Sequence, residues 1–378
     1  MKISKIMSVV SALTLSFALS SCGADKANDS SEDTSKNETE VTENADAADK
    51  TDKADEKSET PTGEVVKVTM VTDEGGVNDK SFNQSAFEGL TSYKDEGKAD
   101  FDYIESHSDA DYQPNLESAL DSESDLILTV GYALFNDTSE AADQNPDQKY
   151  AIIDSANVDE QENLLGITFA DHQNSYLAGY IAGMKTEANH VGFIGGQKSD
   201  VIDRFEYGFR AGVKAAAREK DTDIKVDVQY ANSYSDQAAG KNIANQMYQS
   251  GADVVMHAAG GVGIGVNEAA KENDKWVIGV DRDQSEEAPN HMLVSTIKGV
   301  GDAVKQVIDE LNKGEFAGGT TKQFTLADGK AVDIAYAPND LVAQEVKEKV
   351  EELRKDIVDG KIEVPQNEEE FTSMGYDK

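Results

Sequence analysis

The sequence predicts an α/β protein with two doubly wound lobes, and two observations carry that prediction. Short apolar, β-branched runs recur along the chain, and helical patterns separate them. Near-continuous apolar strands that alternate with helices are typical of parallel sheets covered by helices on both faces. The alternation runs through two successive series, so we expect two such sheets within the 378 residues.

Residues 64–170 hold the first series and are expected to form the first lobe. Its strands are expected at residues 65–72, 101–104, 126–130, 150–153 and 165–169. Its helices are expected near residues 82–95, 111–121 and 133–144. Residues 171–290 repeat the pattern as a second lobe, with strands at 190–195, 224–230, 254–258 and 276–280 and helices near 173–186, 201–218, 236–250 and 262–273.

The C-terminal part departs from this alternation. A strand at 293–297 and a helix near 299–313 are expected to return to the first lobe, which then includes about residues 291–320. The run 322–337 indicates two strands joined by Asp328-Gly329, a dipeptide typical of hairpin turns. A charged helix is expected near 340–360, and part of 321–378 is assigned to the second lobe.

The N-terminal segment, residues 1–22, is expected to be a lipoprotein signal peptide. Two lysines accompany an apolar run that is too short for a comfortable membrane span. The run ends in Leu19-Ser20-Ser21-Cys22, which resembles the bacterial lipobox, and Cys22 is the only cysteine in the chain. Acylation of Cys22 would anchor the protein on the extracytoplasmic face of the cell membrane. The alternative is an ordinary secretory signal with an incidental cysteine.

Residues 23–63 are expected to be a disordered acidic tether. They contain 13 Asp and Glu against 5 Lys, and no aromatic residue, so they cannot bury enough apolar surface to offset their conformational entropy. The whole chain carries a formal net charge of -38, which excludes the basic footprint of a nucleic-acid-binding protein. The same charge disfavours direct docking on anionic lipid, so membrane contact is expected through the anchor only.

The segment after the first strand carries candidate ligand contacts, because ligands of parallel sheets bind beyond the carboxyl ends of the strands. Ser81 and Gln84 fit a capping box that would start the next helix and place Phe82 in its first turn. An aromatic ring beside Asn83, which can both donate and accept, suits a flat heteroaromatic ligand. The alternative is that Phe82 packs in the core, a role for which Phe87 is the better candidate.

Later strand ends supply charged groups. Asp154, Asp281 and Lys298 each follow or end a predicted strand. Carboxylates accept from vicinal hydroxyl groups while a lysine donates to them, although a single aspartate is more often a helix cap. The glycine loop at 260–265 lacks both the dinucleotide spacing and a Walker lysine, so Gly260 indicates close backbone approach to an uncharged ligand.

The chain offers little for catalysis. Its five histidines show no metal-binding spacing, and no Gly-x-Ser-x-Gly nucleophile motif is present. The single cysteine excludes an internal disulfide and a cysteine-based zinc site. We therefore expect a binding protein rather than an enzyme, with no metal and no cofactor.

One run of the chain is specific enough to indicate a family. Residues 75–89 read Gly-Gly-Val-Asn-Asp-Lys-Ser-Phe-Asn-Gln-Ser-Ala-Phe-Glu-Gly and, with Asp73 before them, resemble the signature of the basic membrane protein family. The resemblance covers most of residues 65–300 and includes the motifs Ala151-Ile152-Ile153-Asp154, Phe205-x-x-Gly208-Phe209, Ala259-Gly260-Gly261, Gly279-Val280-Asp281 and Ser295-Thr296-x-Lys298. The family name does not describe the charge of this chain, which is strongly acidic.

The resemblance implies a purine-nucleoside-binding lipoprotein with a type I periplasmic-binding-protein fold. Two Rossmann-like lobes would be joined by a hinge of three crossings, with the nucleoside between them. The side chains assigned to the base are Phe82 and Phe205, as a sandwich, and Asn83 and Asp154, at its edge. Those assigned to the ribose are Asp281, Lys298 and the backbone at Gly260, with Asp73 as a wall residue. Which aspartate faces the base and which the sugar stays open.

We therefore expect a lipid-anchored, monomeric substrate-binding protein that delivers purine nucleosides to the permease of an ABC transporter. The mechanism would be hinge closure, in which bound ligand favours the closed state. Two alternatives stay open: a binding protein for a sugar or another small polar ligand, and a nucleoside-processing surface enzyme. The sequence does not decide an additional role as an adhesin or antigen.

Overall fold

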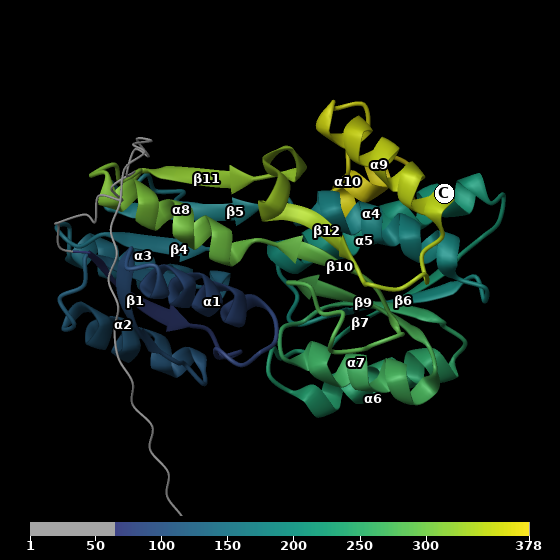
Figure 1. The fold of residues 1–378 in the computed structure, drawn as a ribbon, viewed down its shortest axis with the longest axis horizontal. Coiled ribbons are helices and arrows are strands. Elements are labelled where there is room, and N and C mark those ends of the chain that lie inside the picture. The colour runs from purple at the N-terminus through teal and green to yellow at the C-terminus, as the bar shows by residue number, and fades with distance from the viewer. Residues whose placement is uncertain (1–64, 378) are drawn as a thin grey trace, which may run out of the picture. The chain divides into compact units, whose positions relative to one another are not determined.

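The computed structural model describes residues 65–377. The predicted signal peptide with Cys22 and the predicted tether at 23–63 lie outside the described residues. Within 65–377 the chain forms two six-stranded sheets with helices packed against them (Figure 1). The predicted α/β class with two doubly wound lobes is confirmed.

The first lobe is built on a fully parallel sheet in the order β11-β5-β4-β3-β1-β2. Its strands are β1 (Val66–Thr72), β2 (Ala99–Ile104), β3 (Leu126–Val130), β4 (Tyr150–Ile153), β5 (Leu164–Phe169) and β11 (Thr320–Phe324). Its helices are α1 (Phe82–Asp95), α2 (Tyr112–Leu120), α3 (Phe135–Gln144) and α8 (Val300–Asn312). Met70 packs in the core with α1 and α8, and Val71 packs with α2 and α3, so helices cover both faces.

The second lobe repeats this plan in the order β12-β10-β9-β8-β6-β7, with only β12 antiparallel to its neighbour. Its strands are β6 (His190–Gly195), β7 (Lys225–Tyr230), β8 (Val254–Ala258), β9 (Trp276–Asp281), β10 (Met292–Lys298) and β12 (Val332–Tyr336). Its helices are α4 (Asp171–Lys185), α5 (Asp200–Glu219), α6 (Gln237–Gln249) and α7 (Val262–Asn273). Phe193 packs with α4 and α5, whereas Ile194 packs with α6 and α7.

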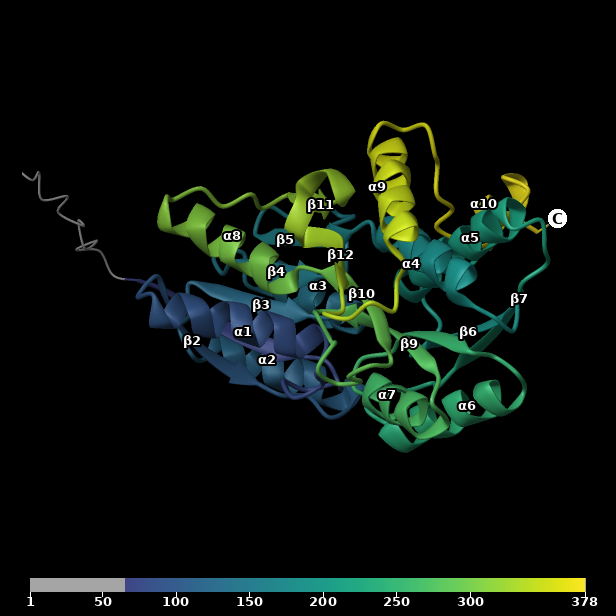
Figure 2. The same ribbon diagram turned by 45° about the vertical axis from the view of Figure 1, so that its right-hand side comes forward.

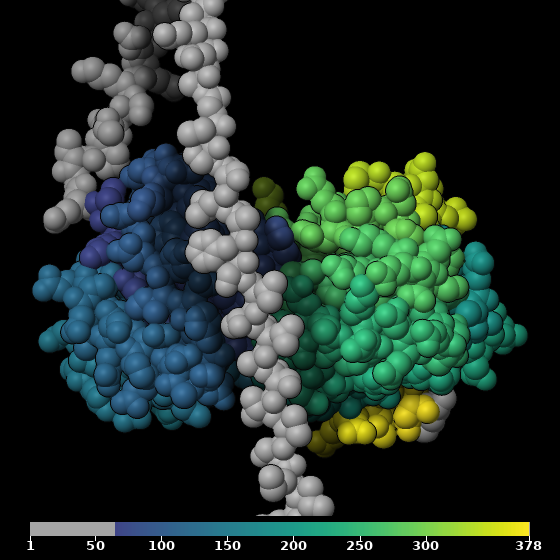
Figure 3. Space-filling model, turned by 90° about the horizontal axis from the view of Figure 1, so that it is seen from below, coloured from purple at the N-terminus to yellow at the C-terminus, as the bar shows by residue number. Residues whose placement is uncertain are grey.

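Two further helices, α9 (Gln344–Val358) and α10 (Glu368–Ser373), pack on the outer side of α4 and α5 (Figure 2). The helix predicted near 340–360 is therefore present. The ring of Phe371 in α10 lies 5.7 Å from the ring of Tyr207 in α5. The guanidinium of Arg210, also in α5, lies 4.6 Å from the centroid of the Phe371 ring. In the space-filling view the blue first lobe and the green second lobe form two masses side by side (Figure 3).

The hairpin predicted within 322–337 is wrong. β11 pairs with β5 in the first sheet, whereas β12 pairs with β10 in the second. The short 3-10 segment Leu326–Ala331 connects them, and Asp328 accepts a hydrogen bond of 2.8 Å from the backbone N–H of Thr325 at its start. Each strand extends the edge of a different sheet, and that outcome depends on partners far away in the sequence.

The strand predicted at 293–297 also differs from expectation. It forms β10 of the second sheet, between β9 and β12, rather than part of the first lobe. The chain returns to the first lobe only after Lys298, where α8 packs against α1 and β1. The predicted return therefore holds for the helix at 299–313 and fails for the strand before it.

Three segments carry the chain between the lobes, and they are bonded to one another. The crossings lie between β5 and α4, between β10 and α8, and between β11 and β12. Backbone Ala170 N–H donates to Phe324 O at 2.8 Å, and Gly299 N–H donates to Ala331 O at 2.7 Å. This close set of crossings is the geometry of a hinge between two lobes.

Candidate functional site

A cavity lies between the lobes at the carboxyl ends of both sheets. The space between the lining atoms, open solvent included, amounts to about 490 Å³. All eight residues predicted to contact a ligand line this cavity: Asp73, Phe82, Asn83, Asp154, Phe205, Gly260, Asp281 and Lys298. The structure thus brings the predicted residues together, and their role as ligand contacts stays a prediction.

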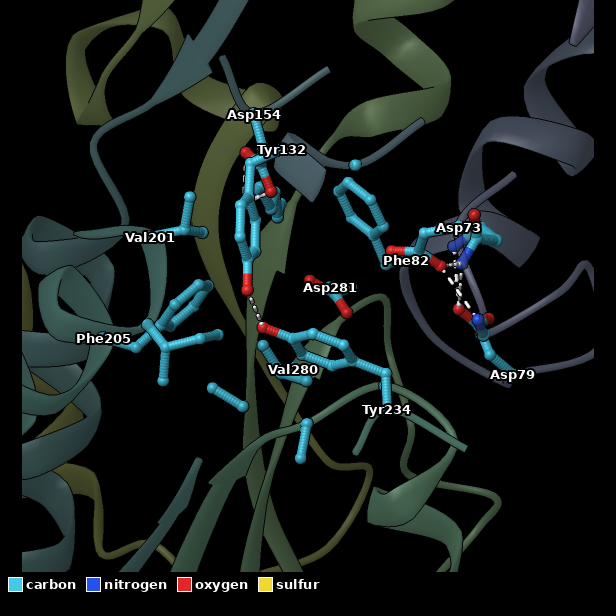
Figure 4. A pocket seen from close by; sticks show the side chains of 18 residues that line it. Asp73, Asp79, Phe82, Tyr132, Asp154, Val201, Phe205, Tyr234, Val280 and Asp281 are labelled. Carbon is cyan, nitrogen blue, oxygen red and sulfur yellow. Dashed lines mark hydrogen bonds and ion pairs between the residues drawn. The ribbon is translucent and has the colours of Figure 1, made fainter. Parts of the chain in front are cut away.

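The two aromatic residues come from different lobes and face the cavity from opposite walls (Figure 4). Phe82 is the first residue of α1, and Phe205 lies in the second turn of α5. Each ring centroid is 5.3 Å from the Nζ atom of Lys298. Phe87 instead packs edge-on against Phe101 at 5.6 Å, so it takes the core role that was considered for Phe82.

Helix α1 begins differently from the prediction. Ser81 is the N-cap residue, but its side chain makes no capping hydrogen bond, so the predicted capping box with Gln84 is wrong. Asp79 instead accepts from the backbone N–H groups of Ser81 at 2.8 Å, Asn83 at 2.8 Å and Gln84 at 3.1 Å. The hydroxyl of Ser81 is therefore free to donate to Asp281 on the other lobe.

Asn83 is held between two carboxylates. Its Nδ2 group donates to Asp73 Oδ1 at 2.7 Å and to Asp79 Oδ2 at 3.1 Å. Its buried Oδ1 atom has no hydrogen-bond partner within residues 65–377, which leaves an acceptor beside the cavity. Burial raises the pKa of Asp73 to about 7, against the hydrogen bonds from Gly75 and Asn83.

Lys298 is a buried cation in the cavity wall, with only 1% of its surface exposed. Its Nζ atom lies 2.7 Å from the carboxylate of Asp154 and 3.2 Å from that of Asp171. Burial acts to lower the pKa of Lys298, but the carboxylates of Asp154, Asp171 and Asp281 more than offset it, so the pKa lies above its usual value. The ammonium therefore stays charged at neutral pH.

Asp154 and Asp281 share an unusual backbone conformation. Their φ angles are +70° and +69°, in the left-handed region that disfavours residues with a Cβ atom. Asp154 follows β4 and Asp281 ends β9, the fourth strand of each lobe in chain order. Backbone strain of this kind is concentrated at functional sites. Burial raises the pKa of Asp281 to about 7, although Lys298 and Ser81 act to lower it.

The glycine loop brings backbone to the cavity, as predicted. Gly260 has φ +55°, a conformation that favours glycine, and it lines the cavity directly before α7. A Cβ atom at Gly260 would lie 3.2 Å from the carbonyl oxygen of Tyr234, so a side chain there would crowd the neighbouring loop.

Several lining residues were not selected from the sequence, among them Asp79, Tyr132, Val201, Ile202 and Tyr234. Tyr132 lies two residues after the end of β3, and that strand-end position identifies it as a candidate. Tyr234 lies in the loop between β7 and α6, where no local signal separates it from a surface residue. The two tyrosine hydroxyls lie 3.1 Å apart and join the lobes across the cavity (Figure 4).

Other contacts also bridge the lobes around the cavity. The side chain of Glu74 accepts from the backbone N–H of Tyr234 at 2.7 Å and from Gln197 at 3.3 Å. On another side, Gln284 Nε2 donates to the backbone carbonyl of Lys80 at 2.9 Å. These contacts can form only when the lobes are together, so the structure represents a closed arrangement.

The cavity combines the rings of two phenylalanines and two tyrosines with several carboxylates and one ammonium. Aromatic faces stack on flat rings, while carboxylates and an ammonium hydrogen-bond to hydroxyl and amine groups. In the described part of the chain, no group of three or more His, Cys, Asp or Glu is placed to hold a metal ion. No helix within residues 65–377 is long and apolar enough to cross a bilayer.

This two-lobed fold with an interlobe cavity defines a class of substrate-binding proteins, and comparison with known proteins names the family. The family described as "ABC transporter substrate-binding protein PnrA-like", or Bmp, matches residues 66–368. The chain belongs to this family, and the predicted resemblance is confirmed.

Individual relatives agree with this assignment. The chain is 44% identical over 321 residues to the ABC transporter nucleoside-binding protein BmpA of Lactococcus lactis subsp. cremoris, with 79% of this chain and 89% of that protein covered. It is 43% identical over 320 residues to the CD4+ T-cell-stimulating antigen of Listeria monocytogenes, with 79% and 88% covered.

A solved structure supports the fold. The crystal structure of an ABC transporter system solute-binding protein from Aeropyrum pernix K1 superposes with a TM-score of 0.75 at 26% identity, and covers 82% of this chain and 96% of that chain. The predicted periplasmic-binding-protein-like fold is confirmed. The family and its transport relatives are named for binding substrates and not for catalysis.

The observed cap of α1 can be tested by substitution. Asp79→Ala removes the acceptor of three backbone N–H groups and should lower the free energy of unfolding by about 1–2 kcal/mol in urea denaturation. Gln84→Ala is the matched control, because its side chain bonds only Glu88 one turn along the same helix, at 2.8 Å. Equal destabilisation by the two variants would contradict the assignment of the cap to Asp79.

The raised pKa of Asp281 predicts a pH-dependent gain in stability on substitution. Its pKa of about 7 lies above the value of 3.8 for an unperturbed Asp, so the buried charge opposes folding above pH 7 and this penalty fades as pH falls below 7. Asp281→Asn should therefore raise the Tm of ligand-free protein by about 2 °C or more at pH 8, and the gain should shrink between pH 7 and pH 3.8, to about half at pH 5.5. Asp302→Asn, at an exposed position in α8, is the control and should leave the Tm unchanged at both pH values. A gain in Tm for Asp281→Asn that is equal at both pH values would contradict the prediction.

Proposed function

We propose that this protein captures purine nucleosides at the outer side of the cell membrane and delivers them to the permease of an ABC transporter. The observation that carries the proposal is the placement of Phe82 and Phe205 on opposite walls of one interlobe cavity (Figure 4). A purine base between the two rings gains stacking on both faces. A flat base joined to a sugar with hydroxyl groups matches both the aromatic and the charged parts of the cavity.

The polar groups of the cavity support a nucleoside as the ligand. Asn83 presents an acceptor without a partner in the described residues, which suits a donor on the edge of a base. Lys298 and the carboxylate of Asp281 suit the hydroxyl groups of a ribose. Asp154, which the resemblance assigns to the edge of the base, is paired with Lys298 at 2.7 Å and is therefore proposed as a ribose contact instead. The Lactococcus lactis relative is named as a nucleoside-binding protein, and family membership supports delivery to an ABC transporter.

Closure of the lobes provides the mechanism. The open lobes admit the ligand, and contacts such as the Tyr132–Tyr234 hydrogen bond form as the lobes close over it. The permease then distinguishes the closed form from the open one. The protein acts as a monomer held at the membrane by acylated Cys22, with residues 23–63 as its tether.

Nucleoside binding is tested by titration calorimetry on protein freed of carried-over ligand. Inosine, guanosine and adenosine should bind more tightly than cytidine, because a purine offers a larger stacking surface. Phe82→Ala and Phe205→Ala should each weaken binding by about 1–3 kcal/mol through the loss of one stacking face. Tyr103→Ala removes an exposed aromatic side chain on β2 and serves as the control.

Each alternative function predicts a different result of this experiment. Failure of every nucleoside to bind would overturn the proposal. Tight binding of a sugar that is unaffected at Phe82 and Phe205 would favour a sugar-binding protein. Release of a free base during prolonged incubation with inosine would favour a nucleoside-processing enzyme.

The anchor is tested by mass spectrometry of the mature protein. The N-terminal peptide should begin at Cys22 and carry acyl chains, which supply about 0.8 kcal/mol of membrane affinity per buried methylene. Cys22→Ala should release the protein into the soluble fraction. A mature protein without lipid at Cys22 would show an ordinary secretory signal instead.

A further inference from the structure

Asp171 contacts the cavity only through another residue. It is the first residue of α4 and is fully buried, and it does not line the cavity. Its Oδ2 atom lies 3.2 Å from Lys298 Nζ and 3.6 Å from Arg204 Nε, while its buried Oδ1 atom has no hydrogen-bond partner within residues 65–377. The carboxylate thus stands between the cation of the cavity wall and a second cation behind it.

A buried ammonium such as that of Lys298 needs compensating charge. Asp154 lies 2.7 Å away, but it also lines the cavity, where a bound ligand would meet it. If Asp154 were the only partner, any ligand hydroxyl that bonded it would compete directly with the ion pair. Asp171 supplies a second negative charge from the side away from the cavity, so Lys298 and Asp154 can both bond to a ligand.

The same ion pair joins two crossings of the hinge. Asp171 begins α4 directly after the crossing from β5, and Lys298 ends β10 directly before the crossing to α8. Beside the pair, Asn174 Nδ2 donates to the backbone carbonyl of Ile297 at 2.8 Å, which also links these two segments. A ligand that contacts Lys298 therefore acts on a residue that is tied to both crossings.

We propose that Asp171 is a positioning residue, which holds the ammonium of Lys298 toward the ligand hydroxyl groups and ties that contact to the hinge. The inference rests on the proposed function, because it takes the hydroxyl groups of a nucleoside as the partners of Lys298. Asp171 touches no ligand itself, so its effect on binding passes entirely through Lys298.

The test compares inosine with 2′,3′-dideoxyinosine, which has the same base and lacks both ribose hydroxyls that Lys298 would contact. Asp171→Asn keeps the size of the side chain and removes its charge. It should lower the affinity for inosine about tenfold and leave that for 2′,3′-dideoxyinosine within about twofold. Asp302→Asn is the matched control, because Asp302 is also an acidic residue in the first turn of a helix after a crossing, but is exposed. A general loss of structure at Asp171 would lower both affinities equally, and that result would overturn the proposal.

A double-mutant cycle separates an effect through Lys298 from an independent one. Lys298→Gln alone should lower inosine affinity, and adding Asp171→Asn should cause no further loss. A further loss of about tenfold in the double variant would show that Asp171 acts on its own and would overturn the proposal.

Two outcomes keep the proposal separate from the function on which it rests. Wild-type protein that binds no nucleoside defeats the proposed function, whereas wild type and Asp171→Asn that bind inosine equally defeat this inference alone. If Asp171→Asn does not fold, Asp171→Glu provides the measurement, since it keeps the charge and moves it by one methylene. Selective weakening of inosine by Asp171→Glu supports the proposal, and equal weakening of both ligands, or of neither, overturns it.

Discussion

The compensation of one buried positive charge organises the cleft of this protein. The ammonium of Lys298 is balanced by Asp154 of the first lobe, by Asp171 at a hinge crossing and by Asp281 of the second lobe. Carboxylates from both lobes can surround one ammonium only when the lobes are closed. Because a buried charge without partners is strongly unfavourable, these groups connect the chemistry of the cavity to the relative position of the lobes.

The two lobes reach this arrangement through the same plan. Both sheets have the same strand order, so Asp154 after β4 and Asp281 at the end of β9 occupy equivalent positions on opposite walls. Both residues are held in left-handed backbone conformations, and burial raises the pKa of Asp281 to about 7. Backbone strain and buried carboxylates reduce the stability of the ligand-free protein. Binding sites commonly keep such destabilising groups because ligand binding needs them.

Reasoning from the sequence succeeded where a residue's role follows from its position relative to a strand. The runs before Asp73 and Asp154 are apolar and β-branched, and a parallel sheet places residues at their carboxyl ends on one edge, so the cavity residues could be predicted. It failed where a local motif had a stronger competitor, either beside it in the chain or far away. Ser81 fits a capping box, but Asp79 folds back onto the same N–H groups and leaves Ser81 to bond Asp281, 200 residues away. The Asp328-Gly329 pair resembles a hairpin turn, but two separate sheet edges take the adjacent strands.

The sequence by itself determined the α/β class, the two series of strands, the family and eight of the residues that line the cavity, because these follow from periodicity, from strand-end positions and from motifs that resemble those of the family. Tertiary structure decided which sheet receives β10, β11 and β12, since strand pairing depends on the edges available in the folded lobes. It also decided that Tyr132 meets Tyr234 and that Asp171 stands behind Lys298. Such contacts join residues more than 100 positions apart, and only the closed packing of two lobes brings them within hydrogen-bonding distance.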